Sequence, residues 1–129
     1  MSYILVVDDE YQTAKSLSNI LTRLGHTVDM AKDGNEMFQL AMVNNYNLVI
    51  ADIVMPDCRG DSAAKLLRVG GCPTPIISVT GLSDDEVKNV RSRFLYLCHK
   101  PVNIDVLLPI INEILSRPAD ADDNEDCED

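Results

Sequence analysis

Residues 48–60 read LVIADIVMPDCRG, an uninterrupted apolar run that ends at Asp52 and is followed by a loop containing proline and glycine. A short apolar run of this kind is typical of a strand that is buried on both faces of a parallel sheet. Residues 3–9, YILVVDD, repeat the pattern, because a second apolar run ends at Asp8 and Asp9. We therefore expect strands at 3–7 and 48–51, each followed by carboxylates.

The rest of the chain alternates short apolar runs with longer segments of helical spacing. Asp33 with Glu36, and Ser83 with Glu86, have the spacing of a capping box that opens a helix. The remaining strands are predicted at 27–31 (a half-exposed edge strand), 75–79 and 94–98. Five strand–helix units with right-handed crossovers predict an α/β fold, a doubly wound five-stranded parallel sheet.

Apolar residues at helical spacing predict the inward faces of the helices. They are Ala14, Leu17, Leu21 and Leu24; Ala63, Ala64, Leu66 and Leu67; Val87 and Val90; Val106, Leu107, Ile110, Ile111 and Ile114. Gly25 is predicted to cap the first of these helices. Pro109 lies inside the last pattern and predicts either a bend or a late helix start, since proline donates no backbone hydrogen bond.

Charge is unevenly distributed along the 129 residues. The formal net charge is −10, and seven acidic and no basic residues lie beyond Arg117, so the first 117 residues carry −3. We expect one domain at 1–117 and an acidic, disordered tail at 118–129. Neither part offers the basic patch that binding to a phosphate backbone requires, so direct nucleic-acid binding is not expected.

The cysteines and the hydropathy pattern bear on the compartment. Four cysteines occur without a CxxC pair, which favours reduced thiols over a disulfide framework or a zinc site. No signal-peptide pattern precedes the first apolar run, and no stretch approaches the roughly 18 apolar residues of a membrane span. A cytoplasmic protein without membrane contact is expected.

Chemically useful side chains follow the predicted strands at their carboxyl ends, the edge where open parallel sheets bind ligands. They are Asp8, Asp9, Asp52, Thr80 and Lys100. Three carboxylates at one edge repel each other unless a cation joins them, and oxygen ligands with room for water and phosphate suit Mg²⁺. A carboxylate can then act as a nucleophile toward a phosphoryl group, with an ammonium and a hydroxyl available to its oxygens.

The order and spacing of four short motifs resemble the response-regulator receiver family of two-component signalling. The motifs are Asp8-Asp9-Glu10, Asp52 with Met55-Pro56 and Gly60, Thr80-Gly81, and Lys100-Pro101. The resemblance covers about residues 3–116 and is closest to the chemotaxis-regulator-like, single-domain type. It implies the flavodoxin-like strand order 2-1-3-4-5.

The resemblance also implies a role for each matched residue. Asp52 is the phosphoacceptor, Thr80 and Lys100 contact the phosphoryl group, and Lys100-Pro101 holds a cis peptide bond. The Mg²⁺ ligands are Asp8, Asp9, Asp52 and the backbone carbonyl of Val54. The implied partners are a sensor histidine kinase or a histidine-phosphotransfer protein as donor, and a downstream effector protein.

Two features depart from the family pattern. The family usually has an aromatic residue three positions before the lysine, where this chain has Leu97, with Tyr96 one position earlier. Adjacent strand residues face opposite sides of a sheet, so Tyr96 fills that role only if a bulge shifts the register. The segment 90–95 lacks the usual Gly-Ala pair. His99 is interpreted as a strand-end side chain rather than a phosphorelay histidine.

Several functions remain open at this point. A stand-alone receiver fits two roles, a phosphorelay intermediate and a regulator that binds an effector when phosphorylated. The alternative is an Asp-nucleophile phosphatase of similar fold, which needs a second aspartate where this chain has Val54. A flavin-binding module of similar fold needs a loop that cradles phosphate after residues 3–7, and this chain has Asp8 and Asp9 there instead. We expect no turnover of small molecules, only phosphorylation and dephosphorylation of the chain itself.

Overall fold

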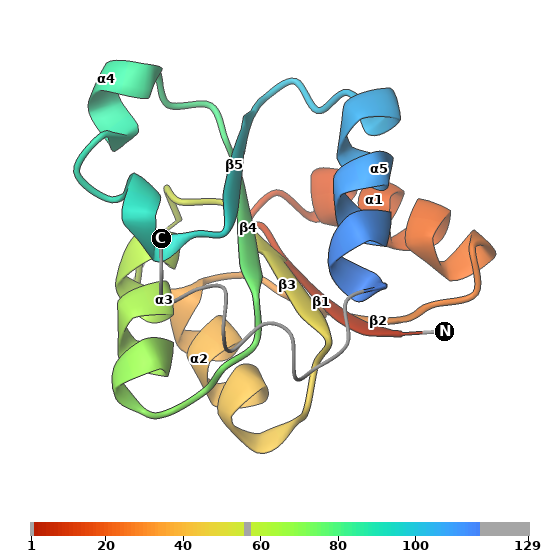
Figure 1. Ribbon diagram of the computed structural model, residues 1–129, viewed down its shortest axis with the longest axis horizontal. Coiled ribbons are helices and arrows are strands. Elements are labelled where there is room, and N and C mark those ends of the chain that lie inside the picture. Colours follow the sequence, from red (N-terminus) through yellow and green to blue (C-terminus); the bar gives the residue numbers. More distant parts are fainter. Residues whose placement is uncertain (1, 56–57, 117–129) are drawn as a thin grey trace.

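A computed structural model describes residues 2–55 and 58–116, which form a three-layered α/β domain (Figure 1). All strand pairs are parallel, and the sheet order is β2-β1-β3-β4-β5, as predicted. The strands are β1 (Tyr3–Val7), β2 (Thr27–Ala31), β3 (Leu48–Ala51), β4 (Ile76–Thr80) and β5 (Tyr96–His99). The helices are α1 (Tyr11–Arg23), α2 (Gly34–Val43), α3 (Gly60–Val69), α4 (Asp84–Val87), the 3₁₀ turn η1 (Arg91–Arg93) and α5 (Ile104–Leu115).

The helices cover both faces of the sheet (Figure 1). Helices α1 and α5 pack on one face, against Ile4, Val6 and Ile50 among others. Helices α2 and α3, together with the α4–η1 segment, pack on the other face, against Leu5 and Val7. Because alternate residues of β1 enter opposite cores, every position of this strand after its first is apolar and buried.

The first three predicted strands agree with the observed ones, and the last two differ at their ends. The strands predicted at 3–7, 27–31 and 48–51 have those bounds, whereas β4 begins at Ile76 and β5 at Tyr96. Phe94, predicted to open the last strand, instead follows η1 and is buried in the core on the α2–α3 side. Its side chain satisfies the apolar pattern without belonging to the strand.

Three residues predicted to face inward are exposed, namely Leu24, Leu66 and, on the last helix, Val106. Leu24 follows the last residue of α1 and is 53% exposed, and Leu66 on α3 is 48% exposed. Leu24 lies where the helix has already ended, because Gly25 adopts a left-handed conformation (φ +98°) as the predicted cap. The amide of Gly25 donates to the carbonyl of Thr22, and the amide of His26 donates to the carbonyl of Leu21. These are the two hydrogen bonds of a Schellman motif.

The capping predictions hold at both helices, with one difference. At α4 the Ser83 side chain accepts from the amide of Glu86, and the Glu86 carboxylate accepts from the amide of Ser83, a complete capping box. At α2 the carboxylate of Asp33 accepts from the amide of Glu36, but Glu36 reaches back one residue further, to the amide of Lys32. Both arrangements satisfy amides that a helix start leaves without partners.

The last helix contains its proline. Helix α5 runs from Ile104 through Pro109 to Leu115 rather than starting after the proline, so the late start was wrong. Leu107, Ile111 and Ile114 pack into the core on the α1 side, which compensates for the backbone hydrogen bond that proline removes. Val106, predicted to face inward, is exposed. The predicted acidic tail at 118–129 lies outside the described residues.

Within the described residues, no helix is both long enough and apolar enough to span a bilayer.

Candidate functional site

The site lies where the order of the sheet reverses. The chain passes from β1 to β2 on one side and returns to β3 on the other, so β1 and β3 are neighbours at the centre. Their register pairs Val7 with Ala51, and the amide of Asp52 donates to the carbonyl of Val7 at 3.0 Å. Asp8 and Asp52 therefore emerge side by side at the carboxyl edge, the usual position of ligand sites in open α/β sheets.

Three carboxylates meet at this edge. Ligand oxygens of Asp8, Asp9 and Asp52 lie within 4.8 Å of one another. Asp8 and Asp52 are only 7% and 8% exposed, whereas Asp9 is exposed to solvent. Burial, and next the charge of Asp8, raise the pKa of Asp9 above its ordinary value. The ionised form of Asp9 is therefore disfavoured beside Asp8, and a cation bound among the carboxylates would favour it.

Lys100 supplies one positive charge to the cluster from the end of β5. Its ammonium donates to a carboxylate oxygen of Asp8 and to one of Asp52, each at 2.9 Å. Burial alone lowers the pKa of Lys100, but the hydrogen bonds to the two aspartates outweigh burial and leave this pKa above its ordinary value. The side chain is thus held as an ammonium between two buried carboxylates.

The carboxylate of Asp52 is oriented on both of its oxygens. The amide of Ile53 donates to Oδ1 at 2.7 Å, while Lys100 binds Oδ2. Gly60 closes the loop behind it, because its amide donates to the carbonyl of Ile53 at 2.8 Å. A side chain at Gly60 would collide with the backbone carbonyl oxygen of Asp52. Glycine is therefore required at this position by the close approach of two backbones.

Thr80 ends β4 and is fully buried. Its hydroxyl oxygen accepts a hydrogen bond from the amide of Leu82 at 3.2 Å, and its carbonyl accepts from the amide of Lys100 at 2.8 Å. The Lys100-Pro101 bond is cis, as predicted. The backbone of β5 thus reaches the threonine while the Lys100 side chain reaches the aspartates.

Val54 is the last residue predicted at the site. It lies two residues beyond Asp52 in the loop after β3, and it is 50% exposed. Its predicted contribution is a backbone carbonyl, so the exposed apolar side chain has no part in that role. As a metal ligand Val54 stays a prediction.

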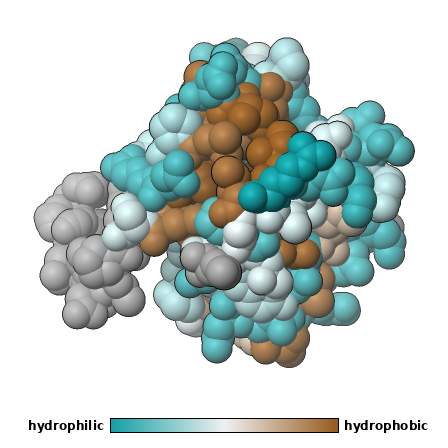
Figure 2. Space-filling view, turned by 90° about the vertical axis from the view of Figure 1, so that its right-hand side faces the viewer, coloured by the Kyte–Doolittle hydropathy of each residue, from teal (hydrophilic) through white to brown (hydrophobic). Residues whose placement is uncertain are grey.

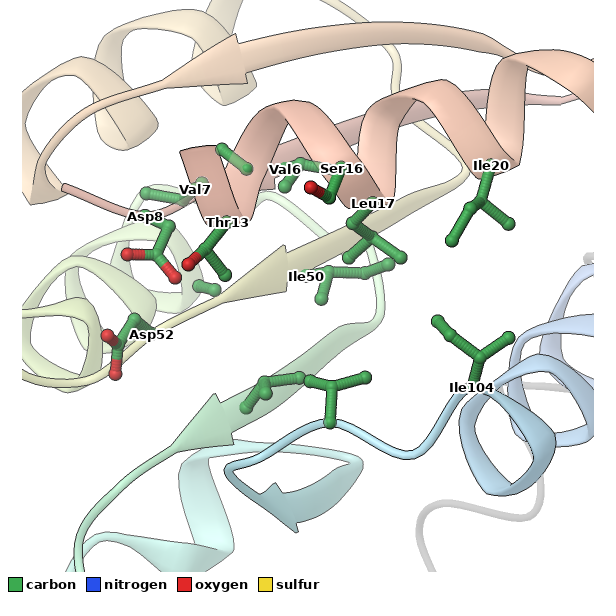
Figure 3. Close-up of a pocket in the computed structure, with 14 residues that line it drawn as sticks. Val6, Val7, Asp8, Thr13, Ser16, Leu17, Ile20, Ile50, Asp52 and Ile104 are labelled. Atoms are coloured by element: carbon green, nitrogen blue, oxygen red, sulfur yellow. The ribbon is translucent and has the colours of Figure 1, made fainter. Parts of the chain in front are cut away.

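An apolar cavity of about 290 Å³ adjoins the acidic cluster between α1 and α5. Figure 3 shows Asp8 and Asp52 at one end of this pocket, with Ile20 and Ile104 at the other. Figure 2 shows hydrophobic side chains gathered on the same face of the molecule. The carboxylates of Asp8 and Asp52 therefore line one end of an apolar cavity.

The structure decides between Tyr96 and Leu97. The register of β4 and β5 runs without interruption from Ile77–Tyr96 to Thr80–His99, so no bulge exchanges the two faces. Tyr96 packs toward α5, and its hydroxyl lies 3.3 Å from the carboxylate of Glu113. Leu97 faces the core on the α2–α3 side, so the position that is usually aromatic in the family carries an aliphatic side chain here.

A 2-1-3-4-5 parallel sheet with three carboxylates and a lysine at its carboxyl edge defines a receiver domain. The family model described as "Response regulator receiver domain" matches residues 4–112, and the chain belongs to this family.

Relatives of known name support the same family. The chain is 34% identical over 118 residues to the transcriptional regulatory protein CusR of Escherichia coli, covering 90% of this chain and 52% of CusR. It is 40% identical over 116 residues to the probable transcriptional regulatory protein SilR of Salmonella typhimurium, covering 88% and 51%. The chain therefore spans about half the length of the curated relatives it matches.

Solved structures agree with the fold. The response regulator TrrA of Thermotoga maritima, in complex with Mg²⁺ and BeF, is 31% identical with a TM-score of 0.81, covering 88% of this chain and 99% of TrrA. The chemotaxis response regulator CheY4 of Vibrio cholerae is 26% identical with a TM-score of 0.81, covering 88% and 98%. An all-oxygen donor set of three carboxylates fits a hard cation such as Mg²⁺ in this chain as well.

Sequence reasoning missed the residues that act through backbone contacts. Nothing in the pattern indicated that the amide of Ile53 binds its neighbour Asp52, and Gly60 was noticed only as part of a motif. His99 ends β5, as its interpretation as a strand-end side chain expects, but its ring contacts with Leu82 and with Asp84 at the start of α4 were not predicted. For these contacts of His99, the only signal in the sequence was a polar residue directly before Lys100.

Proposed function

We propose that this chain accepts a phosphoryl group on Asp52 from a phosphohistidine donor, in a Mg²⁺-dependent reaction. The observation that carries the proposal is the pair of buried carboxylates, Asp8 and Asp52, bridged by one ammonium and adjoined by Asp9. A purely structural role does not account for three clustered carboxylates at a sheet edge. They are accounted for by a site that holds a cation and takes up an anion.

The proposed transfer joins a carboxylate oxygen of Asp52 to phosphorus. The bond from phosphorus to the donor's imidazole nitrogen breaks, and the imidazole, protonated on its other ring nitrogen, keeps the electron pair of that bond and leaves as neutral histidine. The hydrogen bond from Ile53 and the ammonium of Lys100 hold the carboxylate in one orientation before the reaction. Positioning of this kind dominates catalysis of phosphoryl transfer.

We propose that Asp8, Asp9, Asp52 and the carbonyl of Val54 hold Mg²⁺, which neutralises charge on the phosphoryl oxygens. Lys100 then exchanges one of its carboxylate partners for a phosphoryl oxygen, as a mobile point charge can. Thr80 donates its hydroxyl hydrogen to another. The hydroxyl oxygen already accepts from Leu82, so its hydrogen remains available as a donor.

The proposed donor is a sensor histidine kinase or a histidine-phosphotransfer protein. The apolar cavity between α1 and α5 opens beside Asp52 and offers such a partner a hydrophobic contact next to the acceptor. Onward transfer in a phosphorelay and binding of an effector protein both fit this site. Incubation of the phosphorylated chain with a histidine-phosphotransfer protein separates them, since rapid loss of the label indicates a relay. A cytoplasmic location and the absence of nucleic-acid contact by this domain stay predictions.

A phosphatase of the Asp-nucleophile class is the weaker proposal. Such an enzyme needs a general acid two residues beyond its nucleophile, and Val54 cannot donate a proton. We expect phosphorylation and hydrolysis of Asp52 itself, without turnover of small phosphoesters.

Labelling from a small phosphodonor tests the proposal. The chain treated with acetyl phosphate and Mg²⁺ should gain one phosphoryl group in its intact mass, and EDTA or Asp52→Asn should prevent this. Asp105→Asn, an exposed aspartate in the first turn of α5, is the matched control and should label normally. Equal labelling of the Asp52→Asn variant would show that another residue is the acceptor.

A further inference from the structure

His99 ends β5 and faces the loop between β4 and α4. It pairs in register with Thr80, and its side chain is exposed. Nδ1 of the ring is 2.9 Å from the carbonyl oxygen of Leu82, and Nε2 is 2.7 Å from a carboxylate oxygen of Asp84. Neither the acidic cluster nor its lysine involves this ring, so its contacts need a separate explanation.

The contact with Leu82 has a defined direction. A carbonyl oxygen only accepts hydrogen bonds, so in this contact the ring nitrogen Nδ1 is the donor. The Asp84 carboxylate is largely exposed, so its contact with the ring adds little stability by itself. The contact with the Leu82 carbonyl is therefore the one that positions backbone.

Leu82 is held at both of its peptide groups. Its carbonyl accepts from His99, and its amide donates to the hydroxyl oxygen of Thr80 at 3.2 Å. Its side chain packs against the core on the α2–α3 side. A continuous chain of contacts thus runs from Asp84 through His99 and Leu82 to the Thr80 hydroxyl.

The direction of the last contact matters for the reaction. A hydroxyl has one hydrogen to donate, and a neighbouring donor that occupies one lone pair restricts where that hydrogen points. With Leu82 held in place, the Thr80 oxygen is fixed and its hydrogen is left for an incoming acceptor. Leu97, the other β5 side chain on this face, carries no hydrogen-bonding group and cannot perform the same task.

We propose that His99 is a positioning residue for phosphoryl transfer, which acts through Leu82 to orient the hydroxyl of Thr80. The inference rests on the proposed function and adds a residue to it. It requires that replacing His99 impairs the reaction only while the Thr80 hydroxyl is present.

A double-mutant cycle tests this requirement. The rate of labelling by acetyl phosphate with Mg²⁺ is measured for the wild type, His99→Phe, Thr80→Ala and the double variant. His99→Phe should slow labelling roughly three- to tenfold, the range that one hydrogen bond contributes. In the Thr80→Ala background the same replacement should change the rate by less than about twofold, because additivity fails for residues that act through one another.

Further variants separate positioning from folding. Asp84→Ala should slow labelling, and Asp84→Asn should restore most of the rate, because an amide keeps a hydrogen-bonding group beside the ring. Asp85→Ala removes the neighbouring carboxylate of the same helical turn, and His26→Gln replaces the histidine in the loop between α1 and β2. Both should label at the wild-type rate.

The outcomes separate failure of this inference from failure of the proposed function. If the wild type and His99→Phe are labelled equally fast, the inference is wrong and the proposed function stays intact. An equal loss in the Thr80→Ala background also overturns it, since His99 would then act on the fold rather than on the hydroxyl. A wild type that takes up no label under any condition overturns the proposed function and the inference with it.

Discussion

Replacing Lys100 by methionine should destabilise the protein in the absence of divalent ions. The ammonium is 2.9 Å from a carboxylate oxygen of Asp8 and from one of Asp52, and both carboxylates are buried. Methionine keeps much of the side-chain length and removes the charge. What remains is an uncompensated cluster of three carboxylates.

The magnitude follows from the distance between the ammonium and its two partners. Opposite unit charges 2.9 Å apart attract by roughly 6 kcal/mol at an effective dielectric constant of about 20. Part of this attraction offsets the cost of burying the ammonium, and uptake of a proton by one carboxylate in the variant offsets more. We therefore expect a loss of about 3 kcal/mol in the free energy of unfolding at neutral pH, within the range for breaking a buried pair.

Urea denaturation in EDTA and in Mg²⁺ measures the effect. The loss should appear in EDTA and shrink by more than half in Mg²⁺, because the ion replaces the missing positive charge. Mg²⁺ should also bind the variant more tightly, since it no longer competes with an ammonium for the same oxygens. Lys65→Met, an exposed lysine on α3, is the matched control and should be nearly neutral. Equal stabilities of the two variants in EDTA would refute this reasoning.

Three further predictions concern single residues. Gly60→Ala should cost about 2–3 kcal/mol in urea denaturation, because its Cβ meets the Asp52 carbonyl, whereas Gly81→Ala, with open space around it, should cost little; equal costs would contradict the close approach. Asp9→Asn should stabilise the metal-free protein at neutral pH by less than about 1 kcal/mol and should abolish stabilisation by Mg²⁺. The reason is that the pKa of Asp9 is raised in the folded state, so this residue favours folding at low pH and loses that effect as pH rises through its folded-state pKa. Burial lowers the pKa of His26, so its neutral ring favours folding above the ordinary histidine pKa, and this stability is lost as pH falls through the lowered pKa. His26→Gln should flatten the dependence of the free energy of unfolding on pH in this range. An unchanged dependence would contradict the lowered pKa.

The central strands could be predicted because burial on both faces leaves an unmistakable apolar run. Residues 3–7 and 48–51 have no alternative period, and the aspartates that follow them mark the edge that binds ligands. The edge strand β5 was harder to predict. Phe94 is apolar and buried but precedes the strand, because the 3₁₀ turn before it presents its side chain to the core.

Helix faces were predicted less well near their ends. Leu66 fits a helical period but lies on the outer side of α3, since Ala63, Ala64 and Leu67 already fill the inner side. At the site, the charged side chains could be identified because their types are chemically unusual in combination. The amide of Ile53 could not be identified, because a backbone donor leaves no mark on the sequence.

The most direct test of the central claim is the position of the covalent bond to phosphorus. Borohydride reduces an aspartyl phosphate to homoserine. Peptide mapping of the reduced protein by mass spectrometry then locates the modified residue. Homoserine is expected at Asp52 alone, and only when Mg²⁺ was present during phosphorylation. Homoserine at Asp8 or Asp9, or a phosphoryl group found on a histidine, would contradict the central claim.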